Sequence, residues 1–233
     1  MRAIIISLAV LATACGGDDA PVVRTEALDG FEVVDVLVPM AVTLAEGPRA
    51  SITASGPSDA VAALDFLVEG GRLSVSTVYD GEWLSPKRPR VTLHLMAPPL
   101  RQVNLYEGAR LTTATPVTAA DFEVAFRGKV AEADIDFAGE RFGYFNNGAT
   151  AGRMTVRGEA ARLDIRNLAL ATVEAGALRA RVADVYNASR GDVVVRVRDT
   201  LCVEIVGGGD VVLFGEPAAD VTEGAGAGRL RRG

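Results

Sequence analysis

The sequence has little of several residue types on which common functional sites depend. It contains one histidine and two cysteines in 233 residues, which excludes most zinc sites built from Cys and His ligands. Aromatic residues make up only 6%, and the net charge of −6 provides no basic surface for the phosphates of a nucleic acid. No nucleophile-elbow, P-loop, His-Glu-x-x-His or dinucleotide-binding motif occurs. We therefore expect no nucleic-acid partner, no cofactor and no resident metal, and we assign no catalytic residue.

The first residues form the pattern of an export signal. An apolar run from Ala3 to Leu11 follows Arg2 and precedes small residues, and it is too short to cross a bilayer of roughly 30 Å as a helix. It predicts a signal peptide over residues 1–14. A secreted protein cleaved near Ala14, with Cys15 free or paired to Cys202, is the alternative.

The residues around Cys15 resemble the bacterial lipoprotein signal, in which small residues precede a cysteine that is acylated. One departure is Ala12, which stands where that signal usually has leucine. The resemblance implies a lipid on Cys15 and a membrane contact through that lipid, with residues 15–29 as a flexible tether. Gly16 resembles the residue of lipoproteins sorted to the outer membrane, so we expect the protein at the bacterial cell envelope.

The rest of the chain favours an all-β fold. With 25 glycines, 10 prolines and 49% apolar residues, it is rich in turns yet able to bury a core. Short alternating stretches over residues 30–100 predict a strand-rich N-terminal part of the domain. We allow one short helix there, over Ser58 to Leu67.

Beyond residue 100, pairs of apolar residues recur at intervals of about twenty residues. These pairs are Val103/Leu105, Phe122/Val124, Phe142/Tyr144, Leu163/Ile165, Val182/Val185, Val203/Ile205 and Ala219/Val221. A unit this short cannot bury its apolar face alone, whereas stacked units can. The spacing predicts a right-handed parallel β-helix over residues 101–228, with a tail over 229–233. An antiparallel β-sandwich is the alternative.

Several segments resemble one bacterial family, the auto-transporter adhesin head domains known as head GIN domains. They are the strands of residues 31–44, the Gly-x-Leu-x-Val element of residues 71–75, residues 91–100 ending in Pro-Pro-Leu, and the closing repeat of residues 201–217. The resemblance implies a secreted or lipid-anchored β-helical head. It implies no established activity and brings no catalytic residues.

Three alternating carboxylates form the most reactive-looking group. Glu132, Asp134 and Asp136 point to one face of a predicted strand, where they could hold Ca²⁺ or contact a glycan. The alternative is a charge ladder, because Arg153 and Arg157 follow the first and last of them by one repeat of the pattern.

Other residues could contact a ligand, each with a structural alternative. Trp83 and Tyr79 could stack on a sugar or plug the core, and His94 is expected as an ordinary strand residue. Cys202 is expected as a buried or idle thiol. A run of arginines could form a stripe for an acidic glycan, although aspartates interleave with it; the run comprises Arg157, Arg162, Arg166, Arg179, Arg181, Arg190, Arg196 and Arg198.

These features favour a lipid-anchored, non-enzymatic binding or adhesion head whose partner is a glycan or another cell-surface component. The alternative is a polysaccharide-acting enzyme on the same scaffold. An enzyme needs an acid and a base in one cleft. The acidic trio is expected to be neutralised by arginines, which makes the binding head the preferred hypothesis.

Overall fold

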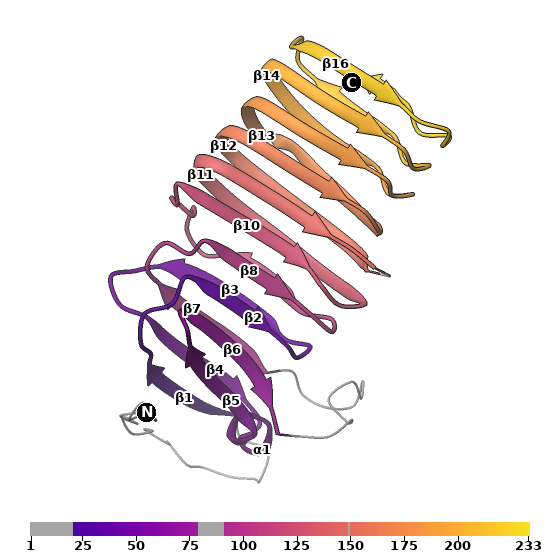
Figure 1. Ribbon diagram of the computed structural model, residues 1–233. Helices are drawn as coiled ribbons and strands as arrows, with labels where there is room; N and C mark the ends of the chain where they lie inside the picture. The colour runs from indigo at the N-terminus through magenta and orange to yellow at the C-terminus, as the bar shows by residue number, and fades with distance from the viewer. Residues whose placement is uncertain (1–20, 79–90, 149) are drawn as a thin grey trace.

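The computed structural model describes residues 21–78, 91–148 and 150–233 of the chain. These residues form strands and one short helix (Figure 1). In order, the elements are β1 Val22–Ala27, β2 Val33–Val36, β3 Ala41–Glu46, β4 Ser51–Gly56, α1 Ser58–Ala62, β5 Leu64–Glu69, β6 Arg72–Thr77, β7 Thr92–Ala97, β8 Gln102–Leu105, β9 Arg110–Thr113, β10 Asp121–Phe126, β11 Val130–Asn146, β12 Ala151–Asn167, β13 Leu170–Asn187, β14 Val193–Ile205, β15 Val211–Phe214, β16 Ala218–Glu223 and β17 Leu230–Arg232.

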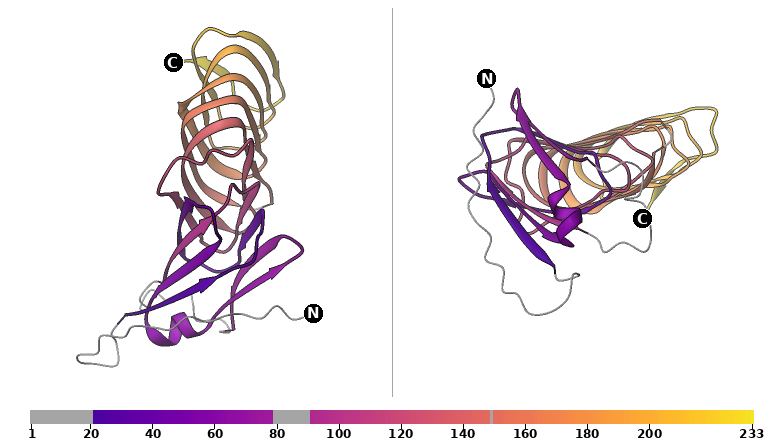
Figure 2. Two further views of the ribbon diagram at one scale, coloured as in Figure 1. Left: turned by 90° about the vertical axis from the view of Figure 1, so that its left-hand side faces the viewer. Right: turned by 90° about the horizontal axis from the view of Figure 1, so that it is seen from below.

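Most of these strands stack in parallel along two tracks of a β-solenoid. The first track runs β6, β2, β8, β10, then the C-terminal halves of β11 to β14, and ends at β16. The second runs β7, β3, β9, then the N-terminal halves of β11 to β14, followed by β15 and β17. Each long strand bends to serve both tracks, as Figure 2 shows. The predicted parallel solenoid is confirmed, with one turn for each repeat of the apolar pattern, and the antiparallel sandwich is excluded.

The apolar repeat lies inside the rod in continuous register. On the first track Val103, Val124, Tyr144, Ile165 and Val185 are successive partners, and all are at most 1% exposed. Inward alternation places them in one core, where burial of each large side chain contributes about 1.5–3 kcal/mol. The predicted inward positions were wrong at two of the pairs. Val182 is half-buried, and Ala183 is the buried residue next to it. The last pair, Ala219 and Val221 in β16, is exposed.

The first turn of the solenoid in sequence is not the first in space. Strand β2 lies between β6 and β8, and β3 lies between β7 and β9, with all four pairings parallel. Val34 therefore pairs with both Leu73 and Val103. The N-terminal part expected over residues 30–100 thus also contributes turns to the parallel stack.

Antiparallel strands close the N-terminal end. Strands β1 and β4 extend the second track beyond β7, and β5 pairs with β6. Helix α1 is shorter than the expected span to Leu67, because Leu64 and Phe66 bury alternate positions of β5. That alternation belongs to a strand, so the helical prediction was wrong beyond Ala62.

Glycine is required where the long strands bend. Gly158 has φ +110°, and a β-carbon there would lie 2.1 Å from the carbonyl oxygen of Phe137 on the neighbouring turn. Gly108, in the turn between β8 and β9, has φ +85°. Both positions use backbone conformations that other residues adopt at a cost.

Candidate binding surface

The acidic trio lies on the outer face of β11, opposite arginines. Glu132 pairs with Arg110 of the preceding turn, and Arg157 of the next turn pairs with both Asp134 and Asp136. The Arg157 Nη1 to Asp134 Oδ1 distance is 2.6 Å. Among the described residues, no three acidic, His or Cys side chains are placed to hold a metal ion. The arrangement is a charge ladder, and the Ca²⁺ and glycan roles of the trio stay predictions.

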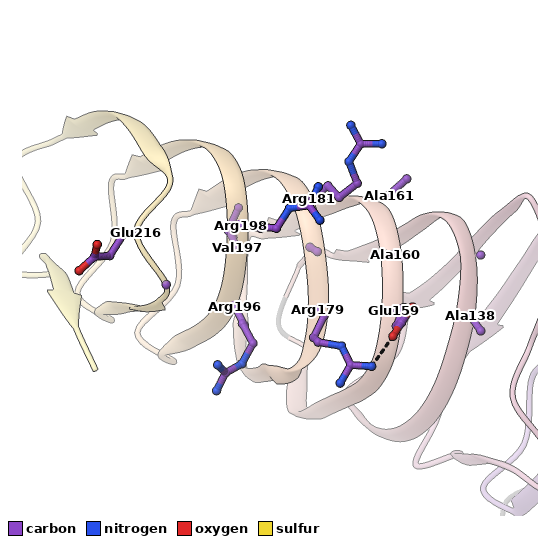
Figure 3. A pocket seen from close by; sticks show the side chains of 13 residues that line it. Ala138, Glu159, Ala160, Ala161, Arg179, Arg181, Arg196, Val197, Arg198 and Glu216 are labelled. Atoms are coloured by element: carbon purple, nitrogen blue, oxygen red, sulfur yellow. Dashed lines mark hydrogen bonds and ion pairs between the residues drawn. The ribbon is translucent and has the colours of Figure 1, made fainter.

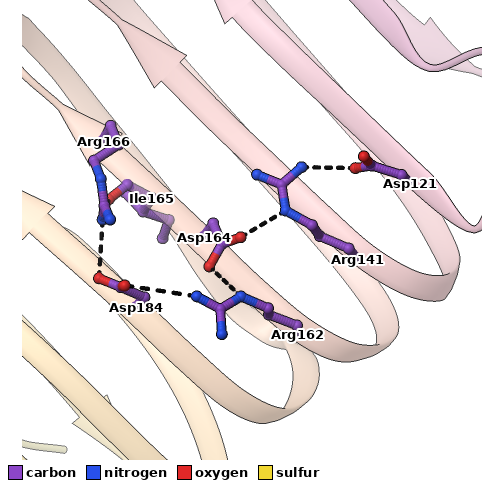
Figure 4. Close-up of polar contacts among 7 residues, drawn as sticks. All are labelled: Asp121, Arg141, Arg162, Asp164, Ile165, Arg166 and Asp184. Carbon is purple, nitrogen blue, oxygen red and sulfur yellow. Dashed lines mark hydrogen bonds and ion pairs between the residues drawn. The ribbon is translucent and has the colours of Figure 1, made fainter.

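A second ladder crosses the outer face of the first track (Figure 4). Arg141 contacts Asp121 and Asp164 at 2.6 Å each, and the ladder continues through two more arginines and one more aspartate. Its members are Asp121, Arg141, Arg162, Asp164, Arg166 and Asp184. Burial lowers the pKa of Arg141, but its bonds to the two aspartates outweigh burial and raise it. Three arginines face three aspartates, so this ladder is balanced in charge.

A groove of about 840 Å³ runs along the bend where the long strands pass from the second track to the first (Figure 3). Its lining comes from successive turns, so a segment of each long strand contributes. The lining residues are Ala138, Gly139, Glu159, Ala160, Ala161, Arg179, Ala180, Arg181, Arg196, Val197, Arg198, Gly215 and Glu216. Four arginines and two glutamates thus surround a set of small residues.

The arginines of the groove are less completely paired than those of the ladders. Arg181 and Arg198 share the single carboxylate of Asp199, at 3.3 and 2.7 Å. Arg196 donates to the Gly176 carbonyl at 2.9 Å and covers a phenylalanine ring. The hydrogen bond from Arg198 lowers the pKa of Asp199 to about 2, so this carboxylate stays ionised and offsets one of the two arginines that share it.

Beneath the surface, three buried asparagines stack at the turn that follows the first track. Asn146, Asn167 and Asn187 are register partners and are fully buried. Asn167 Nδ2 donates to Asn187 Oδ1 at 3.1 Å, and Asn187 Nδ2 donates to the carbonyls of Gly191 and Gly209. These amides supply partners to backbone groups that the turn removes from the sheet.

Of the remaining predicted residues, His94 and Cys202 are described by the structure, and neither lines the groove. His94 is exposed on β7, and Cys202 is an exposed free thiol on β14. Of the two alternatives expected for Cys202, a buried or an idle thiol, the buried one was wrong. Cys202 faces outward because it alternates with the inward residues of its strand. Cys15, Tyr79 and Trp83 lie outside the described residues.

Neither the groove nor the asparagine stack was predicted as a unit. The groove could be detected in the sequence from two Arg-x-Arg motifs, Arg179 with Arg181 and Arg196 with Arg198. Both motifs were included in the predicted run of arginines without being separated from it. The small residues that open the groove come from other turns, and only the register brings them together. The three asparagines recur at the same interval as the apolar pairs, which is a detectable repeat of polar residues.

The chain matches one protein family over most of its length. The family described as "putative auto-transporter adhesin, head GIN domain" matches residues 30–217. No curated protein sequence matches the chain. A putative adhesin from Bacteroides fragilis is structurally similar, with TM-score 0.82 and 16% identity over 91% of this chain and 97% of that one.

Two solved structures from Parabacteroides distasonis show the same fold. A putative adhesin has TM-score 0.70 and 12% identity over 93% of this chain and 98% of its own. A protein titled a putative lipid binding protein has TM-score 0.65 and 16% identity over 91% of this chain and 96% of its own. Of the helices in the described ranges, none has the length and apolar character to cross a membrane.

Proposed function

This chain belongs to the putative auto-transporter adhesin head GIN domain family, and we propose that it is a lipid-anchored, non-enzymatic binding head on the bacterial cell envelope. The family match confirms the resemblance inferred from the sequence. The observation that carries the binding role is the long, regular side of the rod, where charged side chains repeat turn after turn around an open groove.

The arrangement of the carboxylates supports binding over catalysis. Glycoside hydrolysis uses two carboxyl groups with different proton affinities on either side of one bond. The best candidates here, Asp134 and Asp136, stand on one outward strand face and share the guanidinium of Arg157. Two carboxylates on the same strand face, bound to one guanidinium, are not placed on either side of a bond to be cleaved.

The proposed anchor is supported by the N-terminal signal and by the position of the first described strand. Strand β1 begins at Val22, within the range predicted as a tether (residues 15–29), so residues 16–21 separate it from Cys15. A short tether of this kind would hold the N-terminal end of the rod near the bilayer and leave the far end free. The groove lies in the turns of β11 to β14, toward the free end.

The binding role is tested by probing a glycan and cell-wall array with the full chain purified in mild detergent. We expect ligand to be retained intact. Depolymerised glycan whose release is abolished by Asp134→Asn would refute the proposal in favour of the enzyme.

The anchor is tested separately by mass spectrometry of the protein extracted from membranes. We expect a mature N-terminus at an acylated Cys15, and release of Cys15→Ala from the membrane pellet. A mature chain that begins at another residue, or retention of the variant, would refute the anchor.

A further inference from the structure

The floor of the groove is a straight line of small or inward residues. Gly139, Ala160, Ala180 and Val197 are register partners on four successive turns. Their side chains leave the outer surface low, because the alanines and Val197 are buried and glycine has no side chain. Successive turns are about 4.8 Å apart, so the floor extends along the axis of the rod.

Arginines stand on both sides of this floor. Arg179 and Arg196 are register partners along one side, and Arg181 and Arg198 stand along the other, as Figure 3 shows. The side chains of Arg179, Arg181 and Arg198 are 69%, 61% and 71% exposed. Their guanidinium groups are therefore accessible to a ligand that lies on the floor.

The positive charge of the groove is only partly compensated. Arg179 pairs with Glu159, while Arg181 and Arg198 share Asp199, and Arg196 is bound to a carbonyl and a phenylalanine ring. Glu216 also lines the groove, so three carboxylates stand against four arginines. In the ladder of Figure 4, by contrast, arginines and aspartates are equal in number. An anionic ligand would replace water at exposed guanidinium groups without having to break a balanced network.

We propose that this groove binds a linear acidic polysaccharide, whose carboxylate or sulfate groups are contacted by Arg179, Arg181, Arg196 and Arg198. This assignment rests on the proposed binding function and names its ligand. Guanidinium groups bind carboxylates and sulfates through paired N–H donors. Their repetition from turn to turn fits a chain that presents anionic groups at regular intervals.

Other anionic partners fit the groove less well. An extended peptide would pair with a free strand edge, whereas each of the strands β11 to β14 has a paired strand on either side. An anionic membrane attracts a broad basic surface, whereas these arginines line a narrow groove on a chain of net charge −6. A flexible, narrow polyanion requires neither a free strand edge nor a broad basic surface.

The test measures binding of the full chain to polygalacturonate, which carries carboxylates, and to dextran sulfate, with neutral dextran as the reference. We expect saturable binding to at least one polyanion, none to neutral dextran, and weakening as salt rises from about 0.05 to about 0.5 M. The double variant R181Q/R198Q should weaken binding about tenfold or more, because it removes two charge-assisted contacts.

Two further variants separate the groove from charge in general. The control R101Q/R110Q removes the same charge from two arginines that are 64% and 61% exposed on earlier turns, and it should bind within about twofold of the wild type. Ala161→Trp places a bulky group at the groove and leaves the charge unchanged, so it should also abolish binding. Circular dichroism of each variant confirms that the fold is retained.

Three outcomes would overturn the assignment. Equal losses in R181Q/R198Q and R101Q/R110Q would indicate diffuse attraction without a site. Arginine-dependent binding to vesicles containing anionic phospholipid, with no binding to either polysaccharide, would indicate a membrane ligand. If neither polyanion binds and the array retains another component intact, the ligand class is wrong but the protein is still a binding head. Depolymerisation of a glycan without retention would refute the proposed function itself.

Discussion

The buried asparagine stack should contribute strongly to stability, and Asn187→Ala tests this directly. Asn187 donates to the carbonyls of Gly191 and Gly209 at 3.2 and 3.0 Å and accepts from Asn167 Nδ2 at 3.1 Å. Truncation takes a donor from the two glycine carbonyls, whereas Asn167 Nδ2 keeps its bond to the Ala171 carbonyl. At roughly 1 to 3 kcal/mol for each unsatisfied buried group, and with partial relaxation, the free energy of unfolding should fall by about 4 kcal/mol.

The measurement is urea unfolding followed by circular dichroism, with Asn147→Ala as the matched control. Asn147 is exposed next to the stack, so its truncation should change stability by no more than about 0.5 kcal/mol. Asn187→Asp keeps the shape but replaces the donor with a carboxylate opposite two carbonyl oxygens, so it should be no more stable than the alanine variant. A loss below about 1 kcal/mol for Asn187→Ala would show that the stack merely fills space.

Further predictions concern the bend, the last turn and the free thiol. Gly158→Ala should destabilise the protein by about 1–3 kcal/mol in the same assay, because its φ is +110°, whereas Gly30→Ala, with open space around it, should not. The backbone N–H of Arg229 holds the pKa of Asp210 below 3.8, so this contact stabilises the last turn above that pH and is lost as the pH falls toward the lowered value. The protection of the β17 amides against hydrogen exchange, measured relative to the intrinsic rate at each pH, should therefore fall below about pH 4, and Asp210→Asn should remove this pH dependence. Cys202 should be labelled completely by a thiol reagent in the folded protein, and protection would contradict its exposed position.

The solenoid was predictable from the sequence because the inward apolar residues of the first track recur along the chain at a nearly constant interval. Val124, Tyr144 and Ile165 recur at nearly equal intervals and are stacked partners in the rod. The placement of β2 could not be predicted, because a strand repeat carries no information on which turn neighbours which when the order is broken. The sequence of β2, Val-Val-Asp-Val, carries no feature that places it between β6 and β8.

The groove was hidden for a different reason. Its floor depends on which residues of four turns lie at the bend. A slip of the register by a single position would place outward-pointing side chains where the floor now has buried ones. Arg179 and Arg196 lie closer in sequence than one full repeat, since the register shifts where β13 meets β14. Such shifts are a property of the folded backbone, and an average repeat length does not reveal them.

The inserted turn formed by β2 and β3 has a consequence for the order in which the chain folds. Val34 pairs with Leu73 and Val103, both far along the sequence, so an N-terminal segment that is synthesised first has neither neighbour available. Contacts over such separations form slowly, because a long loop must close before they are made. The N-terminal end of the rod is therefore completed only after Thr113, the end of β9, has emerged. Until then the apolar β2 has no neighbouring turn to cover it, which favours aggregation of the incomplete chain.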